Sequence, residues 1–273
     1  MNDKKKSKIP FLKWAGGKRQ IIERIQDQLP DAKRLIEPFC GSATVFINTQ
    51  YQKNLIADTN HDVINIFQQL QDKPIPFIKY CSQFFTPENN ETEQYYQFRQ
   101  EFNQTSNKRL RAALFLYLNK HGYNGLCRYN SSGGFNVPFG KYKKVSFPEK
   151  YLLEFTEKCT GTTFVVQDFE ASFAMAKLGD VIYCDPPYVP LNASNSSFRY
   201  VEKIFSLAQQ EKLAQLAEIS ADKGIPVLIS NHLTDFTSEI YKNAKLTKFS
   251  VQRSISCKGD KREKAKEVLA LFN

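Results

Sequence analysis

The sequence predicts an α/β protein whose parallel sheet is interrupted by a mostly helical insertion. Short apolar, strand-like runs alternate with helical patterns near both ends of the chain, and a long stretch with helical periodicity separates them. Such alternation is typical of parallel sheets, because a parallel neighbour is reached through a crossover helix. We therefore expect a sheet domain at residues 1–60 and 148–273, and an inserted domain at 61–147.

The first strand–helix–strand unit is expected between Arg34 and Asp58. The runs RLIE and NLIAD have strand character, and TVFIN between them has helical character. In the connecting loop EPFCGS, Gly41 permits close approach of a ligand to the backbone. Asp58 ends the second strand, where a carboxylate can accept hydrogen bonds from ribose hydroxyls. Because no G-x-G-x-x-G is present, the pattern favours a nucleoside without phosphates; a plain tight turn is the alternative.

The insertion combines helical periodicity with a basic, aromatic composition. DVINIFQQL, EQYYQFRQEF and RLRAALFLYLNK predict helices, and a Gly-, Asn- and Ser-rich loop follows. From Asn103 to Pro148 there is no Asp or Glu, whereas eight of the chain's Lys and Arg residues fall there and the net charge is +10. Basic side chains neutralise phosphates and aromatic rings stack on bases, so this segment predicts nucleic-acid binding. For Phe115 and Tyr117 we prefer core positions.

A second strand–helix pattern begins near Phe164. TFVVQD, DVIYCD and IPVLIS predict strands, with a helix before the last of them. Ser206 and Gln209 form a capping box at the start of this helix, and Gly224 follows as a stop signal. Its expected apolar face consists of Leu207, Leu213, Leu216 and Ile219. LTKFSVQRSI and EVLALF predict two further strands, joined by the basic loop SCKGDKREKAK.

The sharpest functional feature is the run Asp185-Pro186-Pro187-Tyr188, placed directly after the predicted strand DVIYCD. Ligands of open α/β sheets bind beyond the carboxyl ends of the strands. The two prolines fix the backbone beside the carboxylate. These residues therefore predict a reaction site, with a rigid proline turn after a core strand as the alternative.

Several other classes of site are excluded. FLKWAGGK is not a phosphate-binding P-loop, because Arg19 follows Lys18 and no glycine stands five positions before Gly17. Trp14 in this run is expected either in the core or at a ligand pocket. The six cysteines form no C-x-x-C pair and the three histidines lack ligand spacing, so we expect reduced thiols and no metal. No apolar run is long enough for a membrane span.

In combination, FLKWAGGK, EPFCGS, IAD, the basic insertion and YCDPPY resemble the Dam family of DNA adenine methyltransferases. The likeness covers nearly the whole chain and includes YYQFR, LYLNKHGYNGLCRYN, FNVPFGKYKK and PVLISNH. It implies a Rossmann-like, S-adenosylmethionine-dependent methyltransferase sheet with an inserted DNA-recognition domain. It also implies methylation of the N6 amine of adenine in GATC of double-stranded DNA. We expect a cytoplasmic, nucleoid-associated protein and, without a coiled coil, a monomer.

The resemblance assigns roles to individual residues. The S-adenosylmethionine site is implied at Trp14, Lys18, Glu37, Phe39, Gly41, Asp58 and Asp185. The catalytic motif that holds the target adenine is implied at Asp185, Pro186, Pro187 and Tyr188. Tyr123 and Asn124 match residues at the DNA stack, and base contacts are implied at Lys13, Leu126, Arg128 and Pro138. Lys141, Lys143 and Lys144 are expected at phosphates.

Two positions depart from the family pattern. Ala43 stands where a second glycine is common, and we expect it to tighten the following helix start only slightly. Lys141 stands where relatives also have arginine, which would change a bidentate phosphate contact into a single-point one. Neither departure argues against activity. Arg128 is the residue that we expect to read guanine through its O6 and N7 atoms.

The expected chemistry needs no covalent nucleophile. The lone pair of adenine's amine is delocalised into the ring. Asp185 and the Pro186 carbonyl are expected to accept the two amine hydrogens, which directs the lone pair toward the methyl group for in-line transfer. Tyr188 would stack on a base rotated out of the duplex. A cytosine C5 enzyme would need a reactive cysteine, usually after proline, and none of the six follows one.

Other functions stay open at this point. An amine methyltransferase acting on RNA or on protein glutamine would use similar chemistry, but glutamine enzymes tend to have Asn in place of Asp185. A DNA-binding module on an inactive methyltransferase scaffold is a different class, against which the intact motif residues argue. The sequence leaves open whether a companion restriction enzyme exists, and with it defence, repair marking and gene regulation.

Overall fold

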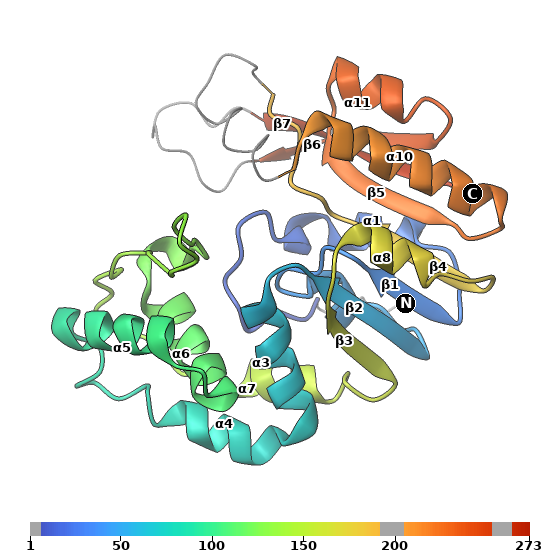
Figure 1. Cartoon of the computed structure of the whole chain (residues 1–273). Coiled ribbons are helices and arrows are strands. Elements are labelled where there is room, and N and C mark those ends of the chain that lie inside the picture. The colour runs from blue at the N-terminus through green and yellow to red at the C-terminus, as the bar shows by residue number, and fades with distance from the viewer. Residues whose placement is uncertain (1–6, 192–204, 253–263) are drawn as a thin grey trace, which may run out of the picture. The chain divides into compact units, whose positions relative to one another are not determined.

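The computed structural model describes residues 7–191, 205–252 and 264–273 (Figure 1). These residues form two compact units, each assembled from separate parts of the chain. The first unit consists of the described part of Met1–Ile22, Cys40–Thr49 and Asp58–Val166. The second consists of Glu23–Phe39, Gln50–Ala57 and the described part of Gln167–Asn273. None of the helices in these residues has both the length and the apolar character needed to cross a membrane.

Seven strands form a mixed sheet in the order β3-β2-β1-β4-β5-β7-β6. They are β1 (Arg34–Glu37), β2 (Lys53–Asp58), β3 (Thr162–Val166), β4 (Asp180–Cys184), β5 (Val227–His232), β6 (Lys245–Gln252) and β7 (Lys264–Phe272). β1 pairs in parallel with β2 and β4, and β4 with β5. β7 runs antiparallel to β5 and β6. The predicted strands are confirmed within the described residues, whereas the last three residues of LTKFSVQRSI lie outside them. The 253–263 segment is too short for a parallel crossover between β6 and β7.

The end of the predicted basic loop needs a correction. The sequence was expected to continue as loop through Lys266, but β7 begins at Lys264, which pairs with Gln252. Within this strand Ala265 is buried and Lys266 is exposed, which is the period-two pattern of a strand with one exposed face. The rest of that loop, including Cys257, lies outside the described residues.

The order of strands reverses direction between β1 and β4. The chain proceeds from β1 outward through β2, and from β4 outward in the opposite direction through β5 (Figure 1). Such a switch point is where open α/β sheets bind ligands, beyond the carboxyl ends of the strands. β1 ends with Glu37, and Asp185 directly follows β4. The fold therefore presents two carboxylates at this position.

Helices α8 (Phe169–Ala174) and α10 (Leu207–Asp222) lie over one face of β4 and β5 (Figure 1). The second unit also contains most of α1 (Ile22–Gln28) and α11 (Asp235–Ile240). The capping box of Ser206 and Gln209 is confirmed at the start of α10. The predicted apolar face is partly wrong, because Ile219 is 48% exposed. Contacts with α8 and β5 instead bury Gln210, Leu213, Ala214, Ala217 and Ser220.

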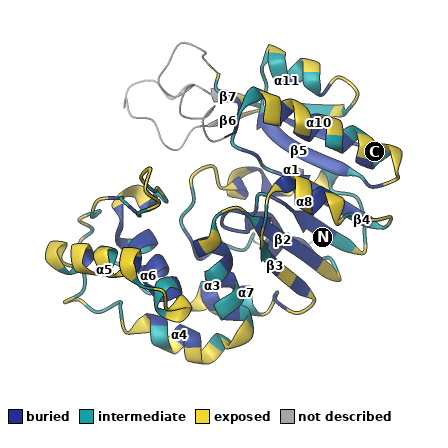
Figure 2. Ribbon diagram, in the orientation of Figure 1, coloured by how far each residue is buried: buried dark blue, intermediate teal, exposed yellow. Residues whose placement is uncertain are grey.

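The first unit contains most of the helices. They are η1 (Lys18–Ile21), α2 (Thr44–Asn48), α3 (His61–Asp72), α4 (Pro74–Ser82), α5 (Thr92–Gln104), α6 (Lys108–His121), η2 (Tyr123–Gly125) and α7 (Glu149–Thr156). Asn60 caps α3 and Asn107 caps α6 through their side-chain oxygens. α6 packs against α3, α4 and α5, and Figure 2 shows it mostly in the colour of buried residues. Phe115 and Tyr117 are fully buried, which confirms their predicted core positions.

Candidate functional site

Two acidic side chains lie at the carboxyl ends of the neighbouring strands β1 and β4. Glu37 is 2% exposed, and Asp185 follows the fully buried Cys184. Burial raises the pKa of the Tyr183 phenol and of the Cys184 thiol, and the charges of Asp185 and Glu37 raise both further. Cys184 is therefore a neutral thiol and not a nucleophile at neutral pH. The site offers carboxylate acceptors in place of covalent chemistry.

The carboxylate of Asp185 is oriented by the next strand. Ser230 of β5 donates its hydroxyl hydrogen to Asp185 Oδ1 at 3.0 Å. The phenol oxygen of Tyr183 lies 3.0 Å from Ser230 Oγ, so Tyr183 can donate to Ser230 while Ser230 donates to Asp185. Both Tyr183 and Ser230 are fully buried. This chain of hydroxyl groups holds the carboxylate in one orientation at the end of β4.

The backbone that follows Asp185 is held by buried side chains. Gln210 of α10 donates to the Pro187 carbonyl at 2.7 Å, and Asn231 of β5 accepts from the Val189 N–H at 3.1 Å. Asn231 in turn donates to Gln210 Oε1 at 3.0 Å. His232 donates from Nδ1 to the Val189 carbonyl at 2.7 Å. The four-residue motif is thus fixed by its surroundings as well as by its prolines.

These supporting residues, Ser230, Asn231 and Gln210, were missed by sequence reasoning. PVLISNH was noted only as part of the family likeness. A usable signal was present, because polar Ser and Asn directly follow the apolar VLI of a core strand. Buried polar side chains require hydrogen-bond partners, which points to a neighbouring polar group.

Aromatic rings surround the predicted positions Phe39 and Tyr188 in the second unit. Phe39 stacks on Phe169 with 5.7 Å between ring centroids and meets Phe205 edge-on at 5.5 Å. The Tyr188 ring meets His232 edge-on at 4.9 Å. Phe39 is half-buried, so this aromatic cluster retains accessible apolar surface.

In the first unit, the structure brings together Trp14, Gly41 and Asp58. A Cβ atom at Gly41 would lie only 2.5 Å from Trp14 Nε1, so the indole requires glycine here. Asp58 accepts the Gly41 N–H at Oδ2 and the Asn60 N–H at Oδ1, both at 2.9 Å. Burial raises the pKa of Asp58, and these N–H groups partly oppose the rise. Lys18 is 8% exposed and donates to the Gly16 carbonyl at 2.6 Å.

The expectation for Ala43 needs a correction. Ala43 adopts φ 57° and ψ 35°, the left-handed region, at the N-cap of α2. A residue with a Cβ atom is strained there by about 1–2 kcal/mol, whereas glycine is not. The departure from the family glycine therefore strains the backbone at this turn and does more than tighten a helix start.

Several predicted DNA-contacting residues converge on the loop after α6. Tyr123 is 51% exposed. The Asn124 N–H donates to the Tyr142 hydroxyl at 2.9 Å. Gly125 has φ +61°, and a Cβ there would lie 2.3 Å from Lys13 Cβ. Lys13 reaches over this glycine to the Tyr142 ring, with Nζ 4.3 Å from the ring centroid, and burial lowers its pKa.

The side chain of Arg128 is exposed and is hydrogen-bonded to Asn136. Its Nε donates to Asn136 Oδ1 at 2.7 Å, and its Nη2 donates to the Asn136 carbonyl at 3.2 Å. A guanidinium has five N–H donors, so further donors remain for a base edge. The remaining predicted positions are half-buried at Leu126 and exposed at Pro138, Lys141, Lys143 and Lys144. Asn136 was not singled out from the sequence.

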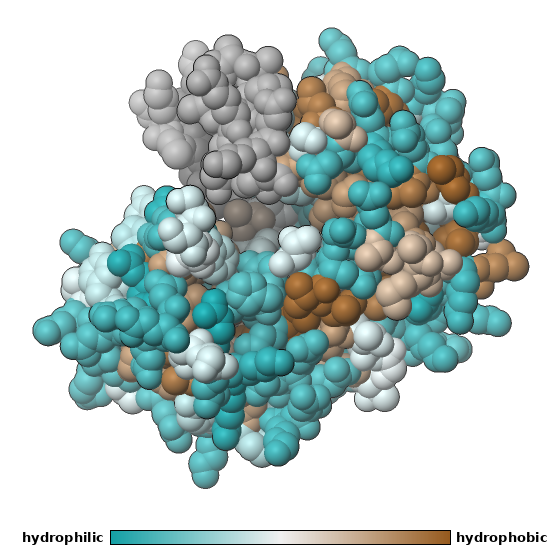
Figure 3. All heavy atoms as spheres, viewed as in Figure 1, coloured by the Kyte–Doolittle hydropathy of each residue, from teal (hydrophilic) through white to brown (hydrophobic). Residues whose placement is uncertain are grey.

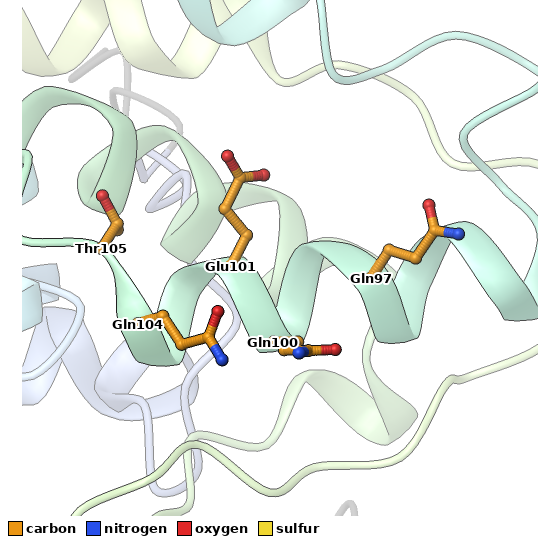
Figure 4. Close-up of a pocket in the computed structure, with 5 residues that line it drawn as sticks. All are labelled: Gln97, Gln100, Glu101, Gln104 and Thr105. Atoms are coloured by element: carbon orange, nitrogen blue, oxygen red, sulfur yellow. The ribbon is translucent and has the colours of Figure 1, made fainter.

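A shallow hollow elsewhere on the first unit runs along α5. Gln97, Gln100, Glu101, Gln104 and Thr105 line it (Figure 4). Gln97 and Glu101, four residues apart, extend on the same side of the helix. The hollow contains no predicted site residue, and its carboxylate would repel phosphate. Figure 3 shows the surface over α4 and α5 as mainly hydrophilic.

Two further features of the described residues are the state of their cysteines and the placement of their possible metal ligands. Among the described cysteines, the free thiols include Cys81, Cys127, Cys159 and Cys184, and the Cys40 thiol donates to the Gly41 carbonyl at 3.9 Å. Within residues 7–191, 205–252 and 264–273, no three His, Cys, Asp or Glu side chains gather as a possible metal site.

Comparison with known proteins decides the family. Residues 14–255 match the family of D12 class N6 adenine-specific DNA methyltransferases. The chain belongs to this family. The methyltransferase is 46% identical to the DNA adenine methylase of Vibrio cholerae, over 98% of this chain and 97% of that protein. It is 47% identical to the DNA adenine methylase of Escherichia coli K12, over 96% and 94% of the two chains. It is thus an adenine-specific enzyme that acts on DNA.

Proposed function

We propose that this methyltransferase transfers the methyl group of S-adenosylmethionine to the N6 amine of adenine within GATC in duplex DNA. The observation that carries the proposal is the position of Asp185-Pro186-Pro187-Tyr188 at the switch point of the sheet, with the Asp185 carboxylate oriented by Ser230. A fixed carboxylate beside a rigid backbone suits an amine whose hydrogens must be held during reaction. GATC is the site that the family resemblance implies.

The residues present fit S-adenosylmethionine by their chemistry. Carboxylates suit its hydroxyl and ammonium groups, a lysine suits its carboxylate, and aromatic rings suit its adenine. When bound, it supplies an electrophilic methyl group on a positively charged sulfur. We assign its contacts to the residues that the family resemblance implies: Trp14, Lys18, Glu37, Phe39, Gly41, Asp58 and Asp185.

The catalytic residues act on the amine of the target base. We propose that Asp185 and the Pro186 carbonyl accept its two hydrogens and pull the nitrogen toward tetrahedral geometry. Its lone pair is then available for direct in-line transfer, in which the bond from nitrogen to the methyl carbon would form as the bond from that carbon to sulfur breaks and leaves a neutral thioether. The nitrogen would then release one of its two hydrogens as a proton to water. Both acceptors favour the positive charge that develops on nitrogen, so they stabilise the transition state more than the ground state. Gln210 supports this arrangement because it holds the adjacent Pro187 carbonyl at 2.7 Å.

Access to the amine requires the adenine to leave the helix. Unstacking costs a few kcal/mol, which an aromatic platform partly offsets. We assign the platform for the rotated adenine to Tyr188. The half-exposed ring of Tyr123, together with Asn124, is assigned to the stack of base pairs. The functional division into a catalytic part (1–60 and 148–273) and a recognition part (61–147) belongs to this proposal.

Sequence reading and phosphate binding are assigned to different residues. Arg128, Leu126, Pro138 and Lys13 are proposed to contact bases. The support for Arg128 is its exposed guanidinium, which Asn136 orients. Phosphate contacts are proposed for three exposed lysines, Lys141, Lys143 and Lys144, because an exposed ammonium group is accessible to the DNA backbone.

Restriction protection tests this function. Purified protein is incubated with unmethylated duplex DNA and S-adenosylmethionine, and the product is digested with enzymes that differ in sensitivity to adenine methylation at GATC. Protection at GATC supports reaction, cofactor and sequence together. Methyl incorporation elsewhere would contradict the assigned site, and preferred incorporation into RNA would contradict the duplex substrate. DNA binding without incorporation would favour the inactive scaffold.

A further inference from the structure

A buried ion pair lies beneath the loop that carries Arg128. Asp62, in the first turn of α3, has no exposed surface. Arg111 of α6 donates to both of its oxygens, from Nε to Oδ1 at 2.5 Å and from Nη2 to Oδ2 at 3.1 Å. This bidentate contact satisfies much of the carboxylate and joins α3 to α6.

The same carboxylate also holds the loop. The hydroxyl of Tyr129 donates to Asp62 Oδ2 at 2.7 Å. Tyr129 directly follows Arg128 in the chain. The hydrogen bond to an ionised acceptor is short and of the stronger kind. Burial and the neighbouring Cys127 and Asp62 raise the pKa of the Tyr129 phenol, so it stays a donor at neutral pH.

Contacts within the loop connect the anchored Tyr129 to the guanidinium of Arg128. Tyr129 and Phe135 form an antiparallel bridge, and their rings meet edge-on at 5.7 Å. The Asn136 N–H donates to the Arg128 carbonyl at 3.1 Å. The Asn136 side chain then accepts from Arg128 Nε. Asn103 of α5 accepts the Phe135 N–H at 2.8 Å and so holds the loop from a second side.

A third anchor joins the loop to the residue that caps α3. Asn60 Nδ2 donates to Cys127 Sγ at 3.6 Å. The Asn60 side-chain oxygen accepts from the N–H groups of Asp62 and Val63. Residues on both sides of Arg128, Cys127 and Tyr129, are therefore tied to the start of the same helix.

We propose that Tyr129, through its hydrogen bond to Asp62, is a positioning residue for sequence specificity: it fixes the segment in which Arg128 reads a base. This inference rests on the proposed base-reading role of Arg128. According to this inference, the Tyr129 hydroxyl affects which DNA sequence the enzyme prefers, in addition to its contribution to folding stability. Replacement by phenylalanine keeps the ring against Phe135 and leaves Asp62 paired with Arg111.

The test compares Tyr129→Phe with the control Tyr117→Phe. Tyr117 is a buried tyrosine of the same unit whose hydroxyl donates to the Asn89 carbonyl and not to Asp62. For each protein, kcat/KM is measured on a duplex with the preferred site and on duplexes with one base changed. We expect Tyr129→Phe to reduce discrimination at one base pair about five- to tenfold, since a hydrogen bond to a charged group is lost. Tyr117→Phe should lower the melting temperature and leave discrimination unchanged.

A double-mutant cycle separates positioning from folding. If Tyr129 acts through Arg128, Tyr129→Phe has no further effect on discrimination in the Arg128→Ala background. Unchanged discrimination in Tyr129→Phe, or an equal effect in both backgrounds, would overturn the inference. A wild-type protein that prefers a site other than GATC contradicts the proposed sequence alone, and the cycle is then run on that site. Wild-type activity without sequence preference would overturn both proposals.

Discussion

Ser230 donates a hydrogen bond from its hydroxyl to Oδ1 of Asp185, across two neighbouring parallel strands, at 3.0 Å. Both residues belong to one compact unit, and Ser230 is fully buried. The hydrogen bond gives the carboxylate a fixed orientation. A catalytic acceptor needs this kind of support, because small errors in its position cost much of the rate.

Ser230→Ala should lower kcat about ten- to hundredfold, because misplacement of a reacting group by an ångström has effects of this size. KM for DNA should change little. Single-turnover methyl transfer at saturating DNA and cofactor measures the effect. Ser220→Ala, at a buried serine of α10, is the matched control and should retain the rate. A Ser230→Ala enzyme with wild-type kcat would remove the serine from the mechanism.

Arg128→Ala should cost about 1–3 kcal/mol of discrimination at one base pair, because a bidentate contact to guanine is lost. Relative rates on GATC and on its single-base variants measure this loss. Lys144→Ala serves as the comparison. It should weaken binding to all sequences alike and reduce the salt dependence of binding by about one phosphate contact. Unchanged relative rates in Arg128→Ala would show that another residue reads the base.

Ala43→Gly should destabilise the fold about 1–2 kcal/mol less than Ala217→Gly, because both substitutions remove a buried methyl group but only the first relieves backbone strain. The left-handed backbone at Ala43 strains a residue with a Cβ atom, while glycine adopts it freely at some cost in unfolded-state entropy. Urea unfolding of both proteins measures the difference. Ala217→Gly, inside α10, is the control and should destabilise by about 1 kcal/mol through helix propensity alone. Equal destabilisation by both substitutions would contradict the strain at Ala43.

The buried imidazole of His121 should make the protein less stable in acid. Burial lowers its pKa to about 4, with a smaller contribution from Lys13, and its Nδ1 donates to the Tyr117 carbonyl. The unfolded chain, with a histidine pKa near 6.5, then binds the proton more readily, so the free energy of unfolding falls as pH drops from about 6.5 to 4. At pH 4.5 this residue should account for about 2–3 kcal/mol of the loss.

Urea unfolding at pH 7 and pH 4.5 checks that pH dependence. His121→Asn removes the titrating group and should reduce the loss of stability between these pH values. His61→Asn is the control, because His61 is an exposed histidine. Identical pH dependence in wild type and His121→Asn would mean that other groups cause the acid sensitivity.

Local patterns predicted most of the sheet, because each strand is marked by its own run of apolar residues. They also predicted where Asp185 lies, since it ends one of those runs. Ser230 was not predicted as its partner, because that contact depends on the pairing of β4 with β5 across 45 residues of chain. The exposure of Ile219 was not predicted for the same reason. Periodicity marks a helix, but contacts with α8 and β5 decide which face is buried.

The candidate DNA-binding loop shows a similar limit. Its basic and aromatic composition indicated nucleic-acid binding and included Arg128. The residues that hold it, Asp62 and Asn136, are common polar types without a motif of their own. Their importance follows from burial and from hydrogen bonds to Tyr129 and Arg128. The left-handed backbone at Ala43 was not predicted either, because alanine rarely adopts that conformation and gives no sign of it in the sequence.

The most direct test of the central claim is the amount and position of N6-methyladenine formed in a short duplex with a single GATC. Mass spectrometry of the digested product, after incubation with S-adenosylmethionine, compares this duplex with one in which GATC is changed to GTTC. We predict N6-methyladenine in the first duplex alone, and none with Asp185→Ala. Equal methylation of both duplexes would contradict the assigned sequence, and full activity of Asp185→Ala at saturating cofactor would contradict the assigned mechanism.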